Sequence, residues 1–174
     1  MIENLNITIN EELFEDSIEY ESWLINVEAS ITFKGKSLSD WTEELSIPTI
    51  SLARELTVNE LELLSQRMIN VIEIVMSNLA SATNAYLSSK TEHELNYANQ
   101  RRIITDCYSE NGKRIPAKET LDSLVLEACS SSYRKTSRSS LVKDYWNNQN
   151  YKLHRLDSYI KSLNIAKRTW GKNE

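Results

Sequence analysis

The longest regular pattern of apolar and polar positions in this chain begins at residue 57. Thr57 and Glu60 form a capping-box signature for the start of a helix. The apolar positions that follow alternate between spacings of three and four residues, which is typical of a coiled-coil seam. The seam comprises Leu61, Leu64, Met68, Val71, Val75, Asn78, Ala82 and Ala85.

A second apolar stripe lies beside the first on the same predicted helix. A helix with two apolar stripes must bury two sides, so a single antiparallel neighbour leaves one of them uncovered. The two stripes therefore predict a bundle or an oligomer. Around residues 88–91 the apolar period lapses, which indicates either a kink or a restart of the helix. The second stripe comprises Ile69, Ile72, Met76, Leu79 and Tyr86.

A second long helix is predicted after a turn at Gly112–Pro116, because proline suits the first position of a helix. Its apolar face is weakened at Ser130–Ser132 by the poor helix propensity of serine, and then resumes as a strict heptad. We therefore expect an all-α fold, namely a long antiparallel helical hairpin with coiled-coil-like seams that assembles into an oligomer. The heptad positions are Val142, Trp146, Gln149, Leu153, Leu156, Ile160 and Leu163.

An acidic segment of residues 1–56 precedes the hairpin, which spans residues 57–174. The segment is predicted to form a smaller, partly irregular helical cap on the hairpin. A capping-box signature at Glu11 predicts an acidic amphipathic helix from there to about Ser30. A short helix is expected at Leu38–Leu45, since a proline follows three residues later. These boundaries define the two predicted parts of the chain.

The net charge changes sign at the predicted turn. Residues 1–110 contain 7 Lys and Arg against 19 Asp and Glu, whereas residues 111–174 contain 13 against 6. A cationic helix joined to an acidic body indicates contact with a polyanion such as nucleic acid. The whole chain has only three glycines, which excludes the glycine-rich phosphate loops of dinucleotide-binding and P-loop proteins.

The cysteine content and hydropathy indicate a cytoplasmic protein, in the host cytoplasm if the chain is phage-encoded. The chain has two cysteines, which we expect to be unpaired, and no apolar leader segment. No apolar run approaches the roughly 18 residues that a membrane span needs. We therefore expect no membrane partner.

No arrangement of residues predicts catalysis, a metal site or a cofactor. His93 lies between two glutamates, but consecutive helical residues point about 100° apart and do not converge on one metal ion. His154 lies on the basic helix, and each histidine is assigned to the solvated surface of its own helix. Cys129 has no histidine or acidic partner in the sequence to activate it as a nucleophile. We therefore expect a protein that is not an enzyme.

The basic second helix is the candidate binding surface. Its cations are interleaved with tyrosines and with Trp146, and this combination is typical of single-strand binding, in which phosphate contacts and base stacking add. The alternative is that the cations pair with the acidic N-terminal helix. The candidate nucleic-acid-binding residues are Arg134, Lys135, Arg138, Lys143, Tyr151, Lys152 and Arg155, with Lys113 and Arg114 at the predicted turn.

The layout of the C-terminal part resembles that of the UvsY recombination mediators of tailed phages. A charged hairpin with a basic turn is followed by the aromatic pair Tyr145-Trp146, by Lys152-Leu153, and by the terminal run Ile160-Lys161-Ser162-Leu163. The resemblance covers roughly residues 60–170. It implies a ring-forming protein that binds single-stranded DNA, displaces the single-strand-binding protein and helps load a RecA-like recombinase, without catalytic residues or a cofactor.

Two other functions remain open on the sequence alone. The hairpins are also suited to a structural or assembly protein that exists to oligomerise. The acidic N-terminal part is longer than the family layout requires, and the sequence pI is about 5.2. An acidic surface of this kind is also suited to a DNA mimic that inhibits a nucleic-acid-binding protein.

Overall fold

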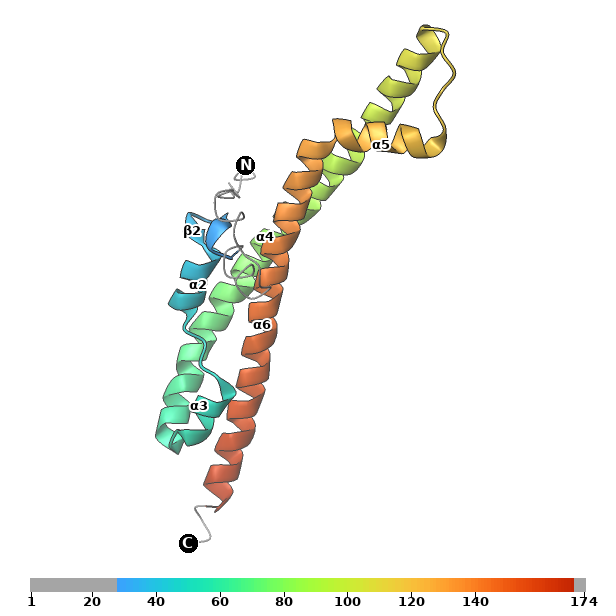
Figure 1. Ribbon diagram of the computed structural model, residues 1–174. Helices are drawn as coiled ribbons and strands as arrows, with labels where there is room; N and C mark the ends of the chain where they lie inside the picture. The colour runs from blue at the N-terminus through green and yellow to red at the C-terminus, as the bar shows by residue number, and fades with distance from the viewer. Residues whose placement is uncertain (1–27, 171–174) are drawn as a thin grey trace, which may run out of the picture. The chain divides into compact units, whose positions relative to one another are not determined.

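The protein is almost entirely helical over the residues that the structure describes. The computed structural model describes residues 28–170, apart from the side chains of Ser51, Leu52, Arg54 and Trp170. The predicted all-α hairpin is confirmed, with a smaller N-terminal cap beside it (Figure 1). In chain order the elements are β1 (Thr32–Phe33), β2 (Lys36–Ser37), α2 (Leu38–Leu45), α3 (Ile50–Glu55), α4 (Val58–Glu110), α5 (Lys118–Ala128) and α6 (Ser130–Trp170).

Two compact units divide the chain. Unit 1 comprises Met1–Ser81 and Asp144–Glu174, and unit 2 comprises Ala82–Lys143. The predicted helix from Glu11 to Ser30 lies outside the described residues, except for its helical end at 28–30. None of the helices within the described range is long and apolar enough to cross a membrane.

Five of the eight positions of the seam predicted on α4 are buried, whereas Leu64, Val71 and Ala85 are half-buried. Leu61, Met68, Val75 and Ala82 are at most 2% exposed, and they recur every seven residues. The predicted capping box forms at the start of the helix, where the backbone N–H of Thr57 donates to the Glu60 carboxylate over 2.8 Å. Hydrogen bonds from Thr57 lower the pKa of Glu60. These contacts begin a helix whose stability comes mainly from its buried seam rather than from local propensity.

α4 continues as one helix through residues 88–91, so the predicted restart is wrong. Ser89 occupies the next heptad position after Ala82 and is 3% exposed. Its hydroxyl donates to the Tyr86 carbonyl over 2.9 Å, and its carbonyl accepts from the Thr136 hydroxyl of α6 over 2.9 Å. A small polar side chain therefore continues the seam, because its hydroxyl is satisfied within α4 and its backbone carbonyl also accepts from α6.

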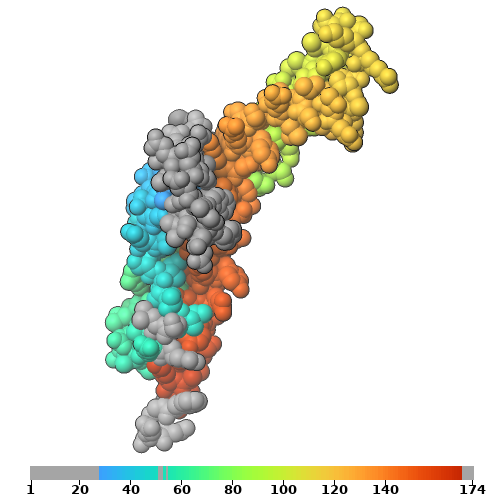
Figure 2. Space-filling model, in the orientation of Figure 1, coloured from blue at the N-terminus to red at the C-terminus, as the bar shows by residue number. Residues whose placement is uncertain are grey.

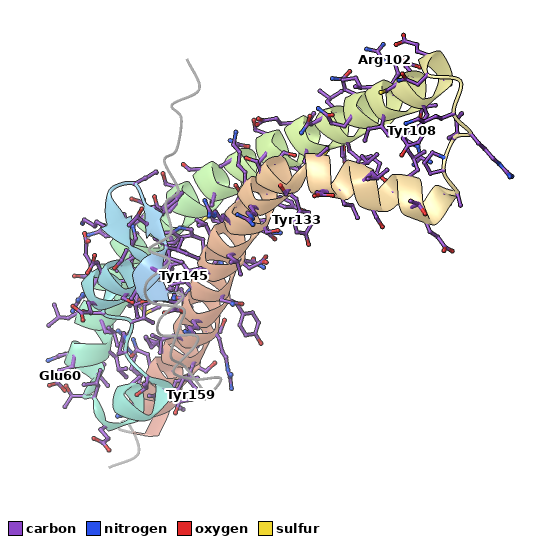
Figure 3. All side chains as sticks on the ribbon, turned by 45° about the horizontal axis from the view of Figure 1, so that its top comes forward. Glu60, Arg102, Tyr108, Tyr133, Tyr145 and Tyr159 are labelled. Atoms are coloured by element: carbon purple, nitrogen blue, oxygen red, sulfur yellow. The ribbon has the colours of Figure 1, made fainter. Side chains whose placement is uncertain are left out.

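Trp146 is the centre of the core of unit 1. Its side chain is fully buried, and its ring centroid lies 5.6 Å from that of Phe33 and 5.3 Å from that of Trp41. Tyr145 packs beside it, and the Tyr145 hydroxyl donates to the Leu38 carbonyl over 3.0 Å. These contacts hold β1 and α2 against α6, and Figure 3 labels Tyr145 at this place. Figure 2 shows the outer surface of the described cap residues, coloured blue to cyan.

The cap is shaped by local turn chemistry. Lys34 and Gly35 connect β1 to β2 with positive φ angles of 52° and 80°. Ser37 and Asp40 form a capping box at the start of α2, and Ser46 ends the helix in the left-handed conformation. The predicted helix at Leu38–Leu45 is therefore confirmed with these bounds.

Unit 2 has its own small core between the far part of α4 and α5. Leu121, Val125 and Cys129 are buried, and Tyr97 and Ile104 of α4 pack against them. The predicted weak point at Ser130–Ser132 coincides with a break, because α5 ends at Ala128 and α6 begins at Ser130. Two helices therefore follow the turn at Gly112, instead of one.

Candidate nucleic-acid interface

One group of candidate residues lies on the first turns of α6 in unit 2. Arg134 is exposed, and within residues 28–170 no acidic side chain pairs with it. Lys135 is also exposed, but its ammonium lies 2.6 Å from the carboxylate of Glu92 on α4. Arg138 is half-buried. The exposed ring of Tyr133, labelled in Figure 3, precedes these cations on the same helix.

Lys143, at the end of unit 2, belongs to the hairpin rather than to an open surface. Its ammonium lies 4.4 Å from the centroid of the Tyr86 ring on α4. A cation over an aromatic face is attracted by the ring quadrupole. The contact ties α6 to α4, so Lys143 is held at the edge of the seam.

A second group lies on α6 in unit 1. Tyr151 is 69% exposed, and Lys152 and Arg155 are exposed beside it. Burial raises the pKa of Glu28 in the cap, and the positive charge of Lys152 acts in the opposite direction. Lys152 therefore lies close to an acidic residue of the cap, whereas Arg155 has no acidic partner among the described residues.

Tyr145, which lies on α6 in unit 1, is not an exposed aromatic side chain. It is only 6% exposed, because α2 covers it. The interpretation of Tyr145 as one of the interleaved stacking residues is therefore wrong, and Trp146 is core as well.

Lys113 and Arg114 lie at the hairpin turn of unit 2, away from the α6 cations of the same unit. Both are exposed, and Ile115 beside them is 44% exposed. Arg102 lies on α4 near the same turn (Figure 3). The neighbouring Arg101 is engaged, because its guanidinium lies 2.7 Å from the Asp122 carboxylate on α5.

Several other cations pair with acidic residues within the hairpin. Arg168 forms an ion pair with Glu62 of α4, and Lys161 lies 2.6 Å from Asp157 on α6 itself. Internal pairing thus accounts for part of the basic helix, although not with the partner that the alternative named. The partners seen here are on α4 and α6, while the acidic N-terminal helix lies outside the described residues.

His93 is not a solvated surface residue, contrary to our expectation. It is half-buried between α4 and α6, and its Nδ1 lies 3.0 Å from the Ser132 hydroxyl. That hydroxyl donates to the Cys129 carbonyl over 2.9 Å and accepts from the Asn96 amide. The Ser132 hydroxyl is therefore shared among three partners, and the tautomer of His93 decides which group is the donor in the contact between them.

The described residues offer no arrangement suited to catalysis around Cys129 or around a metal ion. Burial raises the pKa of the Cys129 thiol, which disfavours the reactive thiolate. Within residues 28–170 no three metal-ligating side chains come together. A hollow lined by Pro48, Met68 and Leu153 holds about 10 Å³, room for one water molecule at most.

The pattern that sequence reasoning could not anticipate is the mixture of exposed and engaged cations on one helix. Lys135 and Arg134 are adjacent in sequence, yet among the described residues only Lys135 has an acidic partner across the hairpin. Comparisons with known protein families, with curated proteins and with solved structures found no match to this chain.

Proposed function

We propose that this protein is a non-enzymatic helical accessory protein that binds single-stranded DNA through exposed tyrosines and cations of α6. The observation that carries the proposal is the group formed by Tyr151, Lys152 and Arg155. An aromatic side chain that is 69% exposed between cations has no packing role in the fold. It offers a stacking surface for a base, and the cations beside it suit the adjacent phosphates.

The second group, at Tyr133 and Arg134, has the same composition and supports the same proposal. Each group offers one exposed tyrosine and at least one cation that lacks an acidic partner among the described residues. Stacking and phosphate contacts of this kind tolerate any base sequence, since every base has an aromatic face. We therefore expect length-dependent binding with little base preference.

The recombination-mediator role rests on the resemblance in layout to the UvsY family. Under this proposal the bound strand is handed to a RecA-like recombinase after the single-strand-binding protein has been displaced. The alternative, a structural or assembly protein, is favoured by a different observation, namely the exposed apolar side chains of Ile69 and Met76 on α4.

Fluorescence anisotropy of a labelled single-stranded oligonucleotide tests the proposal. Replacing Tyr151→Ala should weaken binding about 5- to 150-fold, which corresponds to the roughly 1–3 kcal/mol of one stacked base. Tyr151→Phe should bind like the unmodified protein, because it keeps the ring. The charge reversals Arg134→Glu and Arg155→Glu together should also weaken binding, whereas the matched reversal Lys90→Glu on α4 should not.

The outcomes separate the two functions. Loss of binding with Tyr151→Ala but not with Tyr151→Phe supports strand binding on α6. If the unmodified protein produces no anisotropy change at about 50 mM salt, where phosphate contacts are strongest, the proposal is wrong and the assembly function is preferred. Displacement of a fluorescent single-strand-binding protein from an oligonucleotide then tests the mediator role separately.

A further inference from the structure

One stripe of α4 and one stripe of α6 together form a side of unit 1, the open face. On α4 its apolar members are Ile69, Ile72, Met76 and Leu79. Ile69 and Met76 are 56% and 55% exposed, and the other two are half-buried. The second apolar stripe therefore has no cover among the described residues, although long apolar side chains of this number are usually covered by a partner.

The α6 stripe of the open face contains residues 150, 154, 157, 161, 164 and 168, which again alternate between spacings of four and three. The α4 stripe continues to Glu62, one heptad before Ile69. The ion pair between Glu62 and Arg168 joins the two stripes across the hairpin. The two stripes therefore belong to the same side of the α4–α6 pair.

Two asparagines on this α6 stripe have unsatisfied amide oxygens. Oδ1 of Asn150 and Oδ1 of Asn164 are buried, and no donor within the described residues reaches either of them. Buried carbonyl oxygens are almost always hydrogen-bonded, so such exceptions call for an explanation. Both residues are only half-buried, and rotation about the terminal side-chain bond turns each amide oxygen outward to a donor on a neighbouring molecule.

The charges of the open face suit a second copy better than a polyanion or a polycation. Glu62 is paired with Arg168, and Asp157 lies 2.6 Å from Lys161. Glu62 and Asp157 thus each have a basic neighbour, which offsets their repulsion when two like faces meet. An amide carries both a donor and an acceptor, so asparagines are also suited to pair with each other.

We propose that the open face is an isologous interface with a second copy of this chain, formed about a two-fold axis. In such an interface the same patch of each copy meets itself. With the axis perpendicular to the helices, α4 lies antiparallel on α4 and α6 lies antiparallel on α6, which makes a four-helix arrangement. The inference is independent of the proposed DNA binding.

The positions of the unpaired amides fix the register. Asn150 and Asn164 are centred on residue 157, so an axis there places Asn150 of each copy opposite Asn164 of the other. On α4, Ile69 and Met76 are centred between residues 72 and 73. The centre on α6 is eleven residues from Arg168, and the centre on α4 is ten to eleven residues from Glu62. Because Glu62 and Arg168 form an ion pair, the two centres lie side by side. One axis therefore satisfies both the amides and the apolar stripe.

Light scattering on the full-length protein tests the interface. The unmodified chain of 20.1 kDa should give an even multiple of its mass. The double substitution Ile69→Glu with Met76→Glu should at least halve that mass, with the helical circular dichroism unchanged. The matched control is Leu63→Glu, since Leu63 is 66% exposed on the same helix but lies off the open face.

Two charge designs test the register itself. In the variant Asn150→Asp with Asn164→Asp, each carboxylate faces a carboxylate of the other copy, at two places in the interface. This repulsion should weaken association at least about tenfold. Asn150→Asp with Asn164→Lys places opposite charges together and should retain it. Within one chain the two positions are about 21 Å apart along α6 and do not interact. A monomer, an odd multiple, or equal association of the two designs would overturn the proposal.

Discussion

Tyr145 and Tyr151 lie on the same helix, six residues apart, and the structure gives them opposite roles. Tyr145 is 6% exposed, and its hydroxyl donates to the Leu38 carbonyl over 3.0 Å and lies 2.8 Å from the Thr42 hydroxyl. Tyr151 is 69% exposed. Replacing each by phenylalanine therefore removes one hydroxyl from the core and one from the surface, with no change in apolar volume.

The expected loss for Tyr145→Phe follows from the groups left behind. The Leu38 carbonyl keeps a hydrogen bond from the Thr42 hydroxyl at 3.0 Å, so it is not left unsatisfied. Gln149, only 4% exposed, also hydrogen-bonds to Tyr145 and loses that contact. One net hydrogen bond and one weakened buried amide together predict a loss of about 1–2 kcal/mol in the free energy of unfolding.

Urea unfolding followed by circular dichroism, at one fixed protein concentration, measures both variants. Tyr145→Phe should lower the midpoint without changing the slope, and should lower the melting temperature by about 2–8 °C. Tyr151→Phe should stay within about 0.5 kcal/mol of the unmodified protein. Equal effects of the two substitutions would refute the assignment of Tyr145 to the joint between α2 and α6.

Three further predictions concern local features. Lys152→Met should lower the melting temperature at pH 7 but not at pH 4. Lys152 stabilises the ionised form of Glu28, and protonation of that carboxyl as the pH falls removes this effect. An equal loss at both pH values would contradict this reasoning. Gly112→Ala should cost about 1 kcal/mol by urea unfolding, since its φ of 59° disfavours a side chain although the space around it is open, and Gly112→Asn should cost less. In the folded protein a thiol reagent should label the exposed Cys107 quickly and the buried Cys129 only after unfolding; two fast thiols would argue against the core of unit 2.

Sequence reasoning predicted the long elements because their heptads are strong. Five of the eight seam positions on α4 and the heptad from Val142 to Ile160 are buried as expected. Ser89 was misread as a break, because its hydrogen bonds with Tyr86 and α6 are tertiary and leave no mark in the local pattern. The end of α5 at Ala128 was only partly indicated by the serines after it.

The candidate site was harder to predict, because exposure and pairing depend on what lies across the hairpin. Alternating cations and aromatics are equally compatible with an open groove and with a packed joint. Tyr145 is buried by α2, Lys143 lies over the Tyr86 ring, and Lys135 pairs with Glu92. None of these contacts is visible in sequence spacing, whereas the exposure of Tyr151 leaves it suited to a ligand.

The salt dependence of oligonucleotide binding tests the central claim most directly. Arg134, Lys135, Lys152 and Arg155 are exposed on α6, and each phosphate contact to a single strand contributes about −0.7 to the slope of log K against log salt concentration. The unmodified protein should therefore give a slope of about −2 to −3, and Arg134→Glu with Arg155→Glu should reduce its magnitude by at least about 1.4. No binding at low salt, or a slope that the double reversal leaves unchanged, would contradict strand binding on α6.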